Sequence, residues 1–357
     1  MIVTAIIFIV ILLVLVLSHE AGHFFSARFF GIKVEEFGFG LPPRAVGIKR
    51  KGTIYSLNYL PFGGFVKIKG EEGGGADDPE SFGSKPAWKR SSILLAGVGA
   101  NIFLAFLIFS FVSWWGVPRA VEESPNASSN NQIIITEIVS GSPAEKAGIL
   151  PGDRVLKIDN FAPQSVKELQ EFIVANKTNT LKILLERNEK TKEIMIKPRQ
   201  NPPEGEGPLG VALAQIRIER SPWYWAPVEG AKLTWEVSKL TVFGLTDTVK
   251  KLLVKSDEGG EIAVAGPVGI FNLTGLAKES GLGNLLFFVA LLSINLALIN
   301  VLPLPGLDGG RFLFIIIEVV RGRRISERAS SIAHGIGLAL LLLLMVLITS
   351  YDIARVF

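Results

Sequence analysis

Two histidines and a glutamate stand at the end of the first apolar run of the chain. They form the string His19-Glu20-Ala21-Gly22-His23, which follows directly on the run Ile2 to Leu17. Residues four apart on a helix share a face, so both imidazoles can bind one metal ion. The carboxylate between them can accept a proton from water held by that metal. The spacing therefore predicts metal-assisted hydrolysis, and it is typical of metalloproteases.

These residues lie where an apolar helix would still be in or near a bilayer. Ionisable side chains are costly at that depth, and those that occur there usually serve a function. The alternative to a metal site is a glutamate–histidine pair that closes a proton path, as in a transporter. A transporter would carry paired charges through several spans, and the apolar runs 92–117 and 332–350 contain almost none. The pattern therefore favours a metal-dependent hydrolase.

Two histidines leave the metal site incomplete, because catalytic zinc sites use three protein ligands and a water. The chain has no cysteine and one further histidine, so the third ligand is a carboxylate or His334. Asp308 is the favoured carboxylate, since it follows an apolar run that should cross a membrane in the same direction as the first. Pro303 and Pro305 should interrupt that helix and leave Asp308 on irregular backbone beside water. The simpler interpretations are a helix-capping Asp308 and an interfacial His334.

The composition indicates a membrane protein with one soluble insertion. Of the 357 residues 48% are hydrophobic, the mean hydropathy is +0.40, and the apolar residues concentrate in four blocks. The absence of cysteine excludes disulfides and thiolate metal sites, and the net charge of +4 gives no reason to expect a nucleic-acid partner. No basic region precedes the first block and no small-residue cleavage site follows it. We therefore expect a retained helix rather than a signal peptide.

The four blocks predict transmembrane helices at residues 1–30, 92–117, 282–310 and 332–350. Each approaches the roughly 20 residues that cross a hydrocarbon core. The connecting segments 31–91 and 311–331 are rich in lysine and arginine, whereas the termini are nearly free of basic charge. By the positive-inside rule these two segments are cytoplasmic. Both termini and the long insertion then lie on the outer side, and the active site lies toward the cytoplasmic leaflet.

The segments between the predicted spans differ in kind. The 31–91 segment should be a small membrane-associated β region, with strands at 33–37, 45–48, 53–57 and 65–69. The insertion at 126–200 should be a compact α+β domain, with a helix at 166–175 and strands at 133–135, 154–158, 181–187 and 191–196. Residues 201–281 should form a linker and amphipathic helices on the outer membrane face. The expected fold class is thus an α-helical polytopic membrane protein with a β segment and an inserted domain.

The insertion carries the string Gly141-Ser142-Pro143-Ala144 with Gly152-Asp153 further on, and this pattern resembles PDZ domains. The H-E-x-x-H motif, this single PDZ-like insertion and the string N-x-x-P-x-P-x-L-D-G from Asn300 to Gly309 together resemble the site-2 protease family. The resemblance covers essentially the whole chain and is nearest to the bacterial branch that regulates sigma factors. Many members have Gly-Pro before an asparagine of the second span. Here Val98 stands at that place, before Asn101.

The resemblance implies a role for each motif residue. Those that match His19, His23 and Asp308 bind one zinc ion, and the one that matches Glu20 is the general base. The residue that matches Asn300 holds substrate near the metal, although an asparagine in a span can also serve as an interhelical hydrogen-bonding group. Zinc is the default metal, since iron or cobalt can use the same ligands.

The resemblance also implies partners and a location. The expected protein is an intramembrane zinc endopeptidase of the bacterial inner membrane. Its substrates would be single-span proteins such as an anti-sigma factor, or remnant signal peptides. The PDZ-like domain would bind a C-terminal peptide or act as a size filter. A non-catalytic PDZ-bearing membrane adaptor is the alternative, and the intact set of motif residues argues against it.

Overall fold

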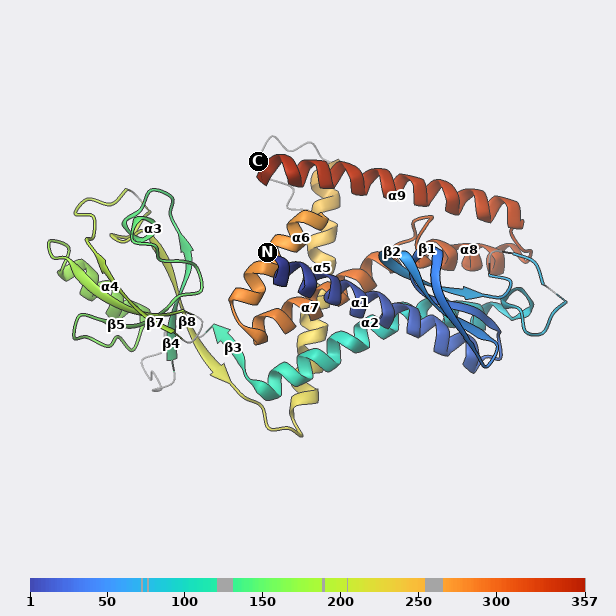
Figure 1. Cartoon of the computed structure of the whole chain (residues 1–357), viewed down its shortest axis with the longest axis horizontal. Coiled ribbons are helices and arrows are strands. Elements are labelled where there is room, and N and C mark those ends of the chain that lie inside the picture. Colours follow the sequence, from blue (N-terminus) through green and yellow to red (C-terminus); the bar gives the residue numbers. More distant parts are fainter. Residues whose placement is uncertain are drawn as a thin grey trace. The chain divides into compact units, whose positions relative to one another are not determined.

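The computed structural model describes residues 1–71, 73–75, 77–120, 131–187, 190–203, 205–253 and 266–356. The chain divides into two compact units (Figure 1). The first comprises Met1–Phe111, Pro227–Lys278 and Asn284–Phe357, and it contains the H-E-x-x-H motif and the string from Asn300 to Gly309. The second comprises Val112–Ala226 with Glu279–Gly283, and we call it the β module.

Among the described residues, four helices are long and apolar enough to cross a membrane, as the sequence predicts. They are α1 (Ile2–Phe29), α2 (Ala87–Trp115), α7 (Leu282–Val301) and α9 (Glu327–Val356). Helices α1, α2 and α7 pack around a cluster that includes Leu15, Leu104 and Val289. Helix α7 ends at Val301, ahead of Pro303 and Pro305, which interrupt it as predicted because they lack the N–H groups that would continue it. After the loop Pro303–Leu307, α8 (Asp308–Arg321) begins.

The predicted β region is a long hairpin of β1 (Val34–Arg50) and β2 (Thr53–Ile68), followed by the 3-10 turn η1 (Phe82–Ser84). Lys51 and Gly52 join the strands with positive φ at both residues, as a type I′ turn requires. All four predicted strands fall within β1 and β2 to within one residue. Both strands fold back, so that Phe37 pairs with Val66 on one side and with Tyr55 on the other. The segment Gly64–Ile68 is consequently an outer segment of this sheet.

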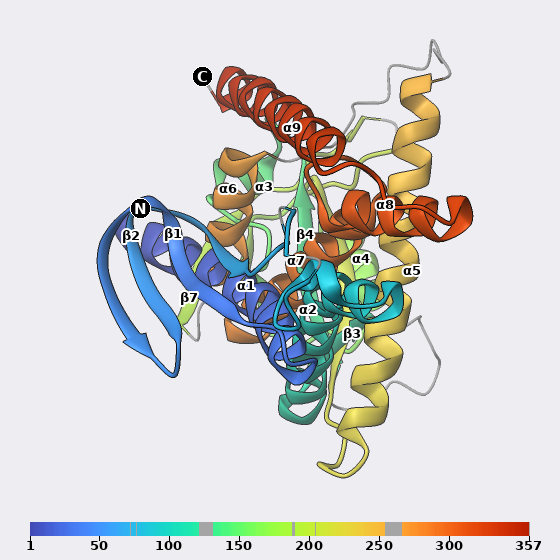
Figure 2. The ribbon, with the colours of Figure 1, turned by 90° about the vertical axis from the view of Figure 1, so that its right-hand side faces the viewer.

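Helices α5 (Ala226–Leu253) and α6 (Pro267–Glu279) occupy the predicted amphipathic region. Helix α5 crosses α2 and α7 at a steep angle in both ribbon views (Figures 1 and 2). Gly230 lies against Ser110 of α2, and Val237 packs with Phe109 of α2 and Ile294 of α7. The prediction of a helix that lies only on the membrane face is therefore incomplete, since α5 also packs against two of the apolar helices.

The β module is built on one antiparallel sheet in the order β3-β8-β4-β5-β6-β7. The strands are β3 (Val117–Ala120), β4 (Asn131–Ile138), β5 (Arg154–Ile158), β6 (Leu181–Arg187), β7 (Lys190–Ile196) and β8 (Val211–Glu219). Two helices accompany them, α3 (Pro143–Lys146) and α4 (Val166–Ala175). The apolar core includes Ile158, Leu169 and Leu181, all fully buried or nearly so.

The sheet extends beyond the predicted boundary of 126–200 at both ends. Strand β8 pairs with β4 along most of its length, from Ile138 opposite Val211 to Asn131 opposite Arg217. It lies in the segment that the sequence analysis assigns to a linker, although its Gln-Ile-Arg-Ile-Glu sequence alternates polar and apolar residues as half-exposed strands do. Strand β3 is only four residues long and gives no comparable signal.

The β module depends on one buried ion pair. Asp153 has 1% of its side chain exposed and pairs with Arg187, whose Nε and Nη2 both donate to it at 2.6 Å. Asp153→Asn should lower the free energy of unfolding of the module by about 2–3 kcal/mol, less than for a fully buried pair because Arg187 is partly exposed. Pulse proteolysis of the full chain in urea measures this. The control is Glu193→Gln, which breaks the exposed pair of Glu193 with Lys182 and should change stability by less than about 1 kcal/mol.

Candidate metal centre and active site

Helix α1 places His19 and His23 one turn apart and buries both against α2. Nδ1 of His23 lies 2.8 Å from the carbonyl oxygen of Ile93 in α2. A carbonyl oxygen only accepts, so Nδ1 carries the proton and donates it. In the neutral ring, Nε2 of His23 is then free of a proton and available to a metal. The sequence alone gives no signal for Ile93, because this contact uses a backbone oxygen of a different helix.

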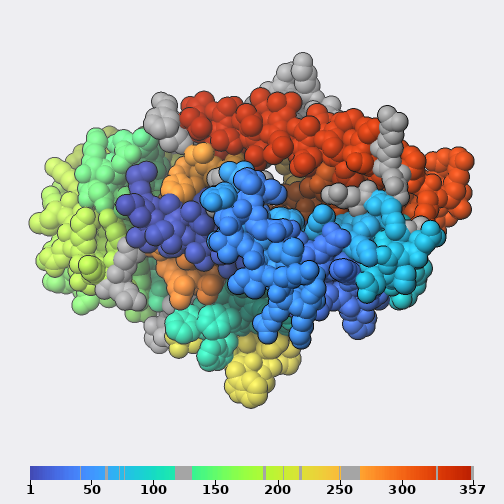
Figure 3. All heavy atoms as spheres, turned by 45° about the vertical axis from the view of Figure 1, so that its right-hand side comes forward, coloured from blue at the N-terminus to red at the C-terminus, as the bar shows by residue number. Residues whose placement is uncertain are grey.

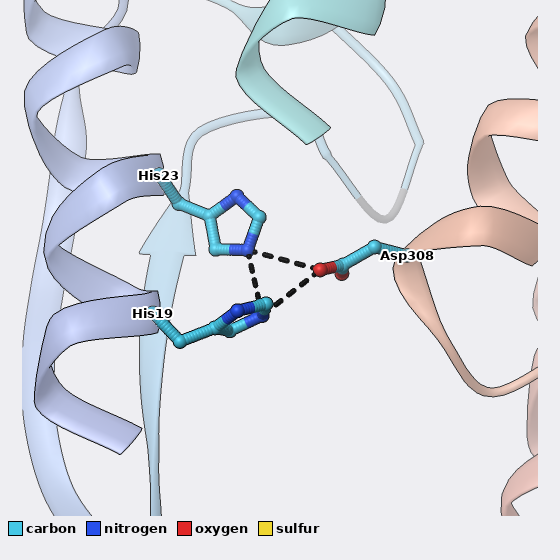
Figure 4. Close-up of side chains that lie close together, drawn as sticks. All are labelled: His19, His23 and Asp308. Atoms are coloured by element: carbon cyan, nitrogen blue, oxygen red, sulfur yellow. Dashed lines mark hydrogen bonds and ion pairs between the residues drawn. The ribbon is translucent and has the colours of Figure 1, made fainter. Parts of the chain in front are cut away.

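Asp308 lies opposite the two histidines (Figure 4). Its Oδ2 is 2.9 Å from Nε2 of His19 and 3.1 Å from Nε2 of His23, and the two Nε2 atoms are 3.2 Å apart. The predicted irregular backbone ends at Leu307, and Asp308 is the first residue of α8. The capping interpretation is wrong, because Leu307 is the N-cap residue and Asp308 points its carboxylate at the histidines.

The three converging atoms fit a metal ion. In the neutral ring Nε2 of His23 is an acceptor, as is the carboxylate of Asp308, so both can bind a cation placed between them. Bonds of about 2.0–2.1 Å in a tetrahedral zinc site separate the ligand atoms by about 3.3–3.4 Å. The observed separations of 2.9, 3.1 and 3.2 Å are close to that spacing. Two imidazoles and one carboxylate are also a usual ligand set for catalytic zinc.

Helix α2 reaches the site through Gly97. A Cβ atom at Gly97 would lie 2.4 Å from Nε2 of His23 and 2.8 Å from Cε1 of His19. Only glycine leaves room for the imidazoles here. One turn further on, Asn101 is fully buried, and neither polar atom of its side chain has a hydrogen-bond partner among the described residues. Asn101 stands out in the sequence, whereas no sequence signal distinguishes Gly97 from the other glycines of α2.

The Gly97→Ala substitution should weaken zinc binding about 10-fold, because the new methyl group must displace the His23 ring. Gly99→Ala is the matched control on the same helix, since a Cβ atom at Gly99 would meet nothing within 4 Å. Competition with a chelator of known affinity measures the zinc dissociation constant of both variants. Equal constants for Gly97→Ala and Gly99→Ala would show that α2 does not shape the metal site.

A cavity of about 760 Å³ opens onto the histidines, Asp308 and Glu20. Its other walls come from Glu35 of β1, the end of β2 and the loop after it, the loop before Asp308, Arg311 of α8 and Leu338 of α9. Arg311 and Glu71 form an ion pair across this wall. Figure 3 shows the blue hairpin below the red α9 on the face where these elements meet. The candidate general base and all three candidate ligands thus share one cavity.

The two remaining residues named from the sequence, Asn300 and His334, differ in their distance from this group. Nδ2 of Asn300, in α7, is 3.5 Å from Nε2 of His19, at the limit of a hydrogen bond. His334 is not part of the group that could hold a metal among the described residues. Its Nδ1 accepts a hydrogen bond from the backbone N–H of Gly306 at 2.9 Å. Asp308, and not His334, is therefore the third residue brought to the histidines.

Comparison with known proteins gives the family. The model of peptidase family M50, the site-2 proteases, matches residues 7–344. A protein of Clostridium acetobutylicum, provisionally named a zinc metalloprotease, is 32% identical over 340 residues, which are 95% of this chain and 94% of its own length. The regulator of sigma-W protease RasP of Bacillus subtilis is 28% identical, with 99% of each chain covered. The zinc metalloprotease RasP of Oceanobacillus iheyensis is also 28% identical, with 99% of each covered.

These matches extend across nearly the whole chain and include both the H-E-x-x-H helix and Asp308. The family indicated by the sequence motifs is confirmed, and the relatives' names agree with a donor set that suits zinc. The chain belongs to peptidase family M50 and is a zinc metalloprotease with four helices able to cross a membrane.

Proposed function

We propose that this protease cleaves peptide bonds in the membrane-spanning segments of single-span proteins. The observation that carries the proposal is the position of the site. His19, Glu20 and His23 lie on a helix that can itself cross a membrane, and they open with Asp308 into one 760 Å³ cavity. A buried polar cavity beside an apolar helix is suited to bringing water to a bond that the bilayer would otherwise keep dry.

In this proposal His19, His23 and Asp308 hold the zinc. A zinc ion bound there would polarise the scissile carbonyl and would lower the pKa of a water to roughly 7. Glu20 accepts a proton from the attacking water and delivers it to the leaving amine. The bond from His23 to the Ile93 carbonyl keeps that imidazole oriented throughout. Asn300, beside His19, is placed to donate to a carbonyl of the substrate.

The substrate must unwind, because the carbonyls of a helix are held in its internal hydrogen bonds. Gly64–Ile68 of β2 lines the catalytic cavity and pairs with β1 on one side only, within the described part of the chain. An unwound substrate can add to its other side as a further strand. Proline at Phe65 or Val66 should therefore lower kcat/KM at least 10-fold without loss of zinc. Proline at Ile48, on the opposite edge of the sheet, is the control. Equal cleavage rates in all three variants would refute the addition of the substrate as a strand.

Cleavage by the purified full chain in detergent tests the proposed function. Wild-type protein with one zinc ion should cut a tagged single-span substrate, stop when a chelator is added, and recover with Zn²⁺. An anti-sigma factor and a remnant signal peptide are the two substrates to compare, since the name of the Bacillus subtilis relative connects that protein to sigma-W. Cleavage of soluble unfolded chains alone would refute the membrane substrate. Zinc binding without any cleavage would favour the adaptor.

We also propose that the β module is a PDZ domain that binds the C-terminal end of a peptide. Residues Val211–Gln215 of β8 pair with β4 on one side, while β3 covers only the far half of β8 on the other. Helix α4 lies beside this open edge, where Gln215 accepts a hydrogen bond from the N–H of Val166 at 3.4 Å. A peptide can add there as a strand. A peptide library with free and amidated C-termini tests this. If the β module shows no preference for the free carboxylate, its remaining proposed role is that of a size filter.

The proposed topology places both termini and the β module outside the cytoplasmic membrane of a bacterium. It is open to a clean test, because the chain has no cysteine of its own. Lys49→Cys marks the hairpin and Glu171→Cys marks the β module, and both positions are exposed. A maleimide that does not cross membranes should label the Glu171→Cys protein in intact cells and the Lys49→Cys protein only after lysis. The reverse pattern would invert the topology.

A further inference from the structure

Helix α9 lies directly against the loop that precedes Asp308. Most of its apolar stretch is exposed, but Gly337 is buried between the exposed Ile336 and Leu338. A Cβ atom at Gly337 would lie only 1.9 Å from the carbonyl oxygen of Pro305. The backbone of α9 thus touches the backbone of the loop, and any side chain at Gly337 would separate them.

His334, one turn earlier on α9, holds the same loop. Its Nδ1 accepts the hydrogen bond from the N–H of Gly306, so the ring proton of the neutral imidazole is on Nε2. Nε2 is itself buried, with no partner among the described residues. The ring also packs edge-on against Phe314 of α8, with the centroids 6.0 Å apart. The prediction of an interfacial His334 does not include these contacts, which its ring and its Nδ1 make with Phe314 and Gly306.

Hydrogen bonds within the loop also shape it, from the N–H of Leu304 to the carbonyl oxygen of Leu302 at 2.7 Å and from the N–H of Leu307 to that of Leu304 at 3.2 Å. Pro303 and Pro305 have no N–H groups to donate. Gly306 has a positive φ of 99° and stands two residues before Asp308. A shift of Gly306 would therefore move Asp308 at the start of α8, whose Oδ2 must stay within about 3 Å of both imidazoles to complete a zinc site.

We propose that His334 is a positioning residue that sets the place of Asp308 through its hydrogen bond to Gly306. This inference rests on the proposed role of Asp308 as a zinc ligand. His334 itself does not touch the metal, because its acceptor nitrogen is occupied by Gly306. Groups that orient a metal ligand in this way typically contribute 10- to 100-fold to metal affinity or activity.

Two substitutions at His334 separate positioning from simple packing. Asparagine can place its Oδ1 where Nδ1 accepts now, whereas leucine fills space without an acceptor. His334→Leu should raise the zinc dissociation constant about 10-fold and lower kcat more than it changes KM. His334→Asn should stay within about 3-fold of wild type in both. Chelator competition gives the dissociation constant independently of cleavage.

Two glycines on α9 provide the matched pair. Gly337→Ala pushes α9 away from Pro305 and should reproduce the loss seen with His334→Leu. A Cβ atom at Gly335 would meet nothing within 4 Å, so Gly335→Ala should bind zinc as the wild type does. Should His334→Leu fail to fold, the glycine pair and His334→Asn still decide the question.

The proposal is overturned if His334→Leu binds zinc as tightly as wild type, or if His334→Asn loses as much as His334→Leu. It is equally overturned if Gly335→Ala and Gly337→Ala behave alike. A wild-type protein that binds no zinc would instead refute the proposed function, since the positioning of Asp308 would then have no metal to serve.

Discussion

The Glu20→Gln protein should retain about one zinc ion per chain and cleave a single-span substrate about 10²- to 10⁴-fold more slowly than wild type. Glutamine has nearly the same shape as glutamate but cannot take up a proton at neutral pH. Glu20 lies in the catalytic cavity without being one of the three residues whose ligand atoms converge. The substitution therefore removes proton transfer and leaves the metal ligands in place. Single-turnover cleavage in detergent, with zinc quantified on the same sample, measures both effects.

The matched control is Glu35→Gln. Glu35 lines the same cavity from β1, and its charge pairs with Lys67 at 3.4 Å near the surface. Its loss should change the cleavage rate by less than about 3-fold, as expected for an exposed ion pair. If Glu20→Gln loses its zinc, Glu20 is a ligand rather than the base. If it cleaves at the wild-type rate, the proton is transferred by another group.

The local part of the site is predictable from the sequence. His19, Glu20 and His23 lie within five residues of one helix, so the helical period alone brings the two imidazoles to one face. The helical period cannot predict Asp308, because 285 residues separate it from His23. Its distinctive motif and the parallel crossing of two apolar runs point to it, and the structure brings it to the histidines.

The contacts between helices at the site cannot be predicted from the sequence. Ile93 contributes a backbone oxygen, which every residue has, and Gly97 contributes the absence of a side chain. Neither leaves a residue-type signal. His334 was visible as one of three histidines, but its role depends on how α9 meets the loop at Gly306. In the β module, the composition of β8 only suggests a strand. The strand forms because it pairs with β4, which lies far from it in the sequence.

Asp308→Asn should abolish most zinc binding, with a loss of affinity beyond the roughly 100-fold that changes outside the ligand set can cause. A neutral amide is a weaker ligand than a carboxylate, and its NH₂ group cannot bind a cation at all. The two imidazoles then remain without the negative charge that lies 2.9 and 3.1 Å from them. Cleavage should fall with zinc occupancy and should recover in part when excess Zn²⁺ is added.

A buried aspartate elsewhere in the same unit serves as the control for Asp308→Asn. Asp352 of α9 is 8% exposed and accepts a hydrogen bond at 2.8 Å from the N–H of Gly269, near the start of α6. Asp352→Asn should cost about 1 kcal/mol of stability, as the loss of a helix cap does, and should leave zinc affinity unchanged. If both variants lose zinc to the same extent, the loss of zinc reflects a general loss of folding and not the removal of a ligand. If the Asp308→Asn protein binds zinc with wild-type affinity, the third ligand is a different residue. Asp308 and α8 would then form part of the cavity wall without binding the metal.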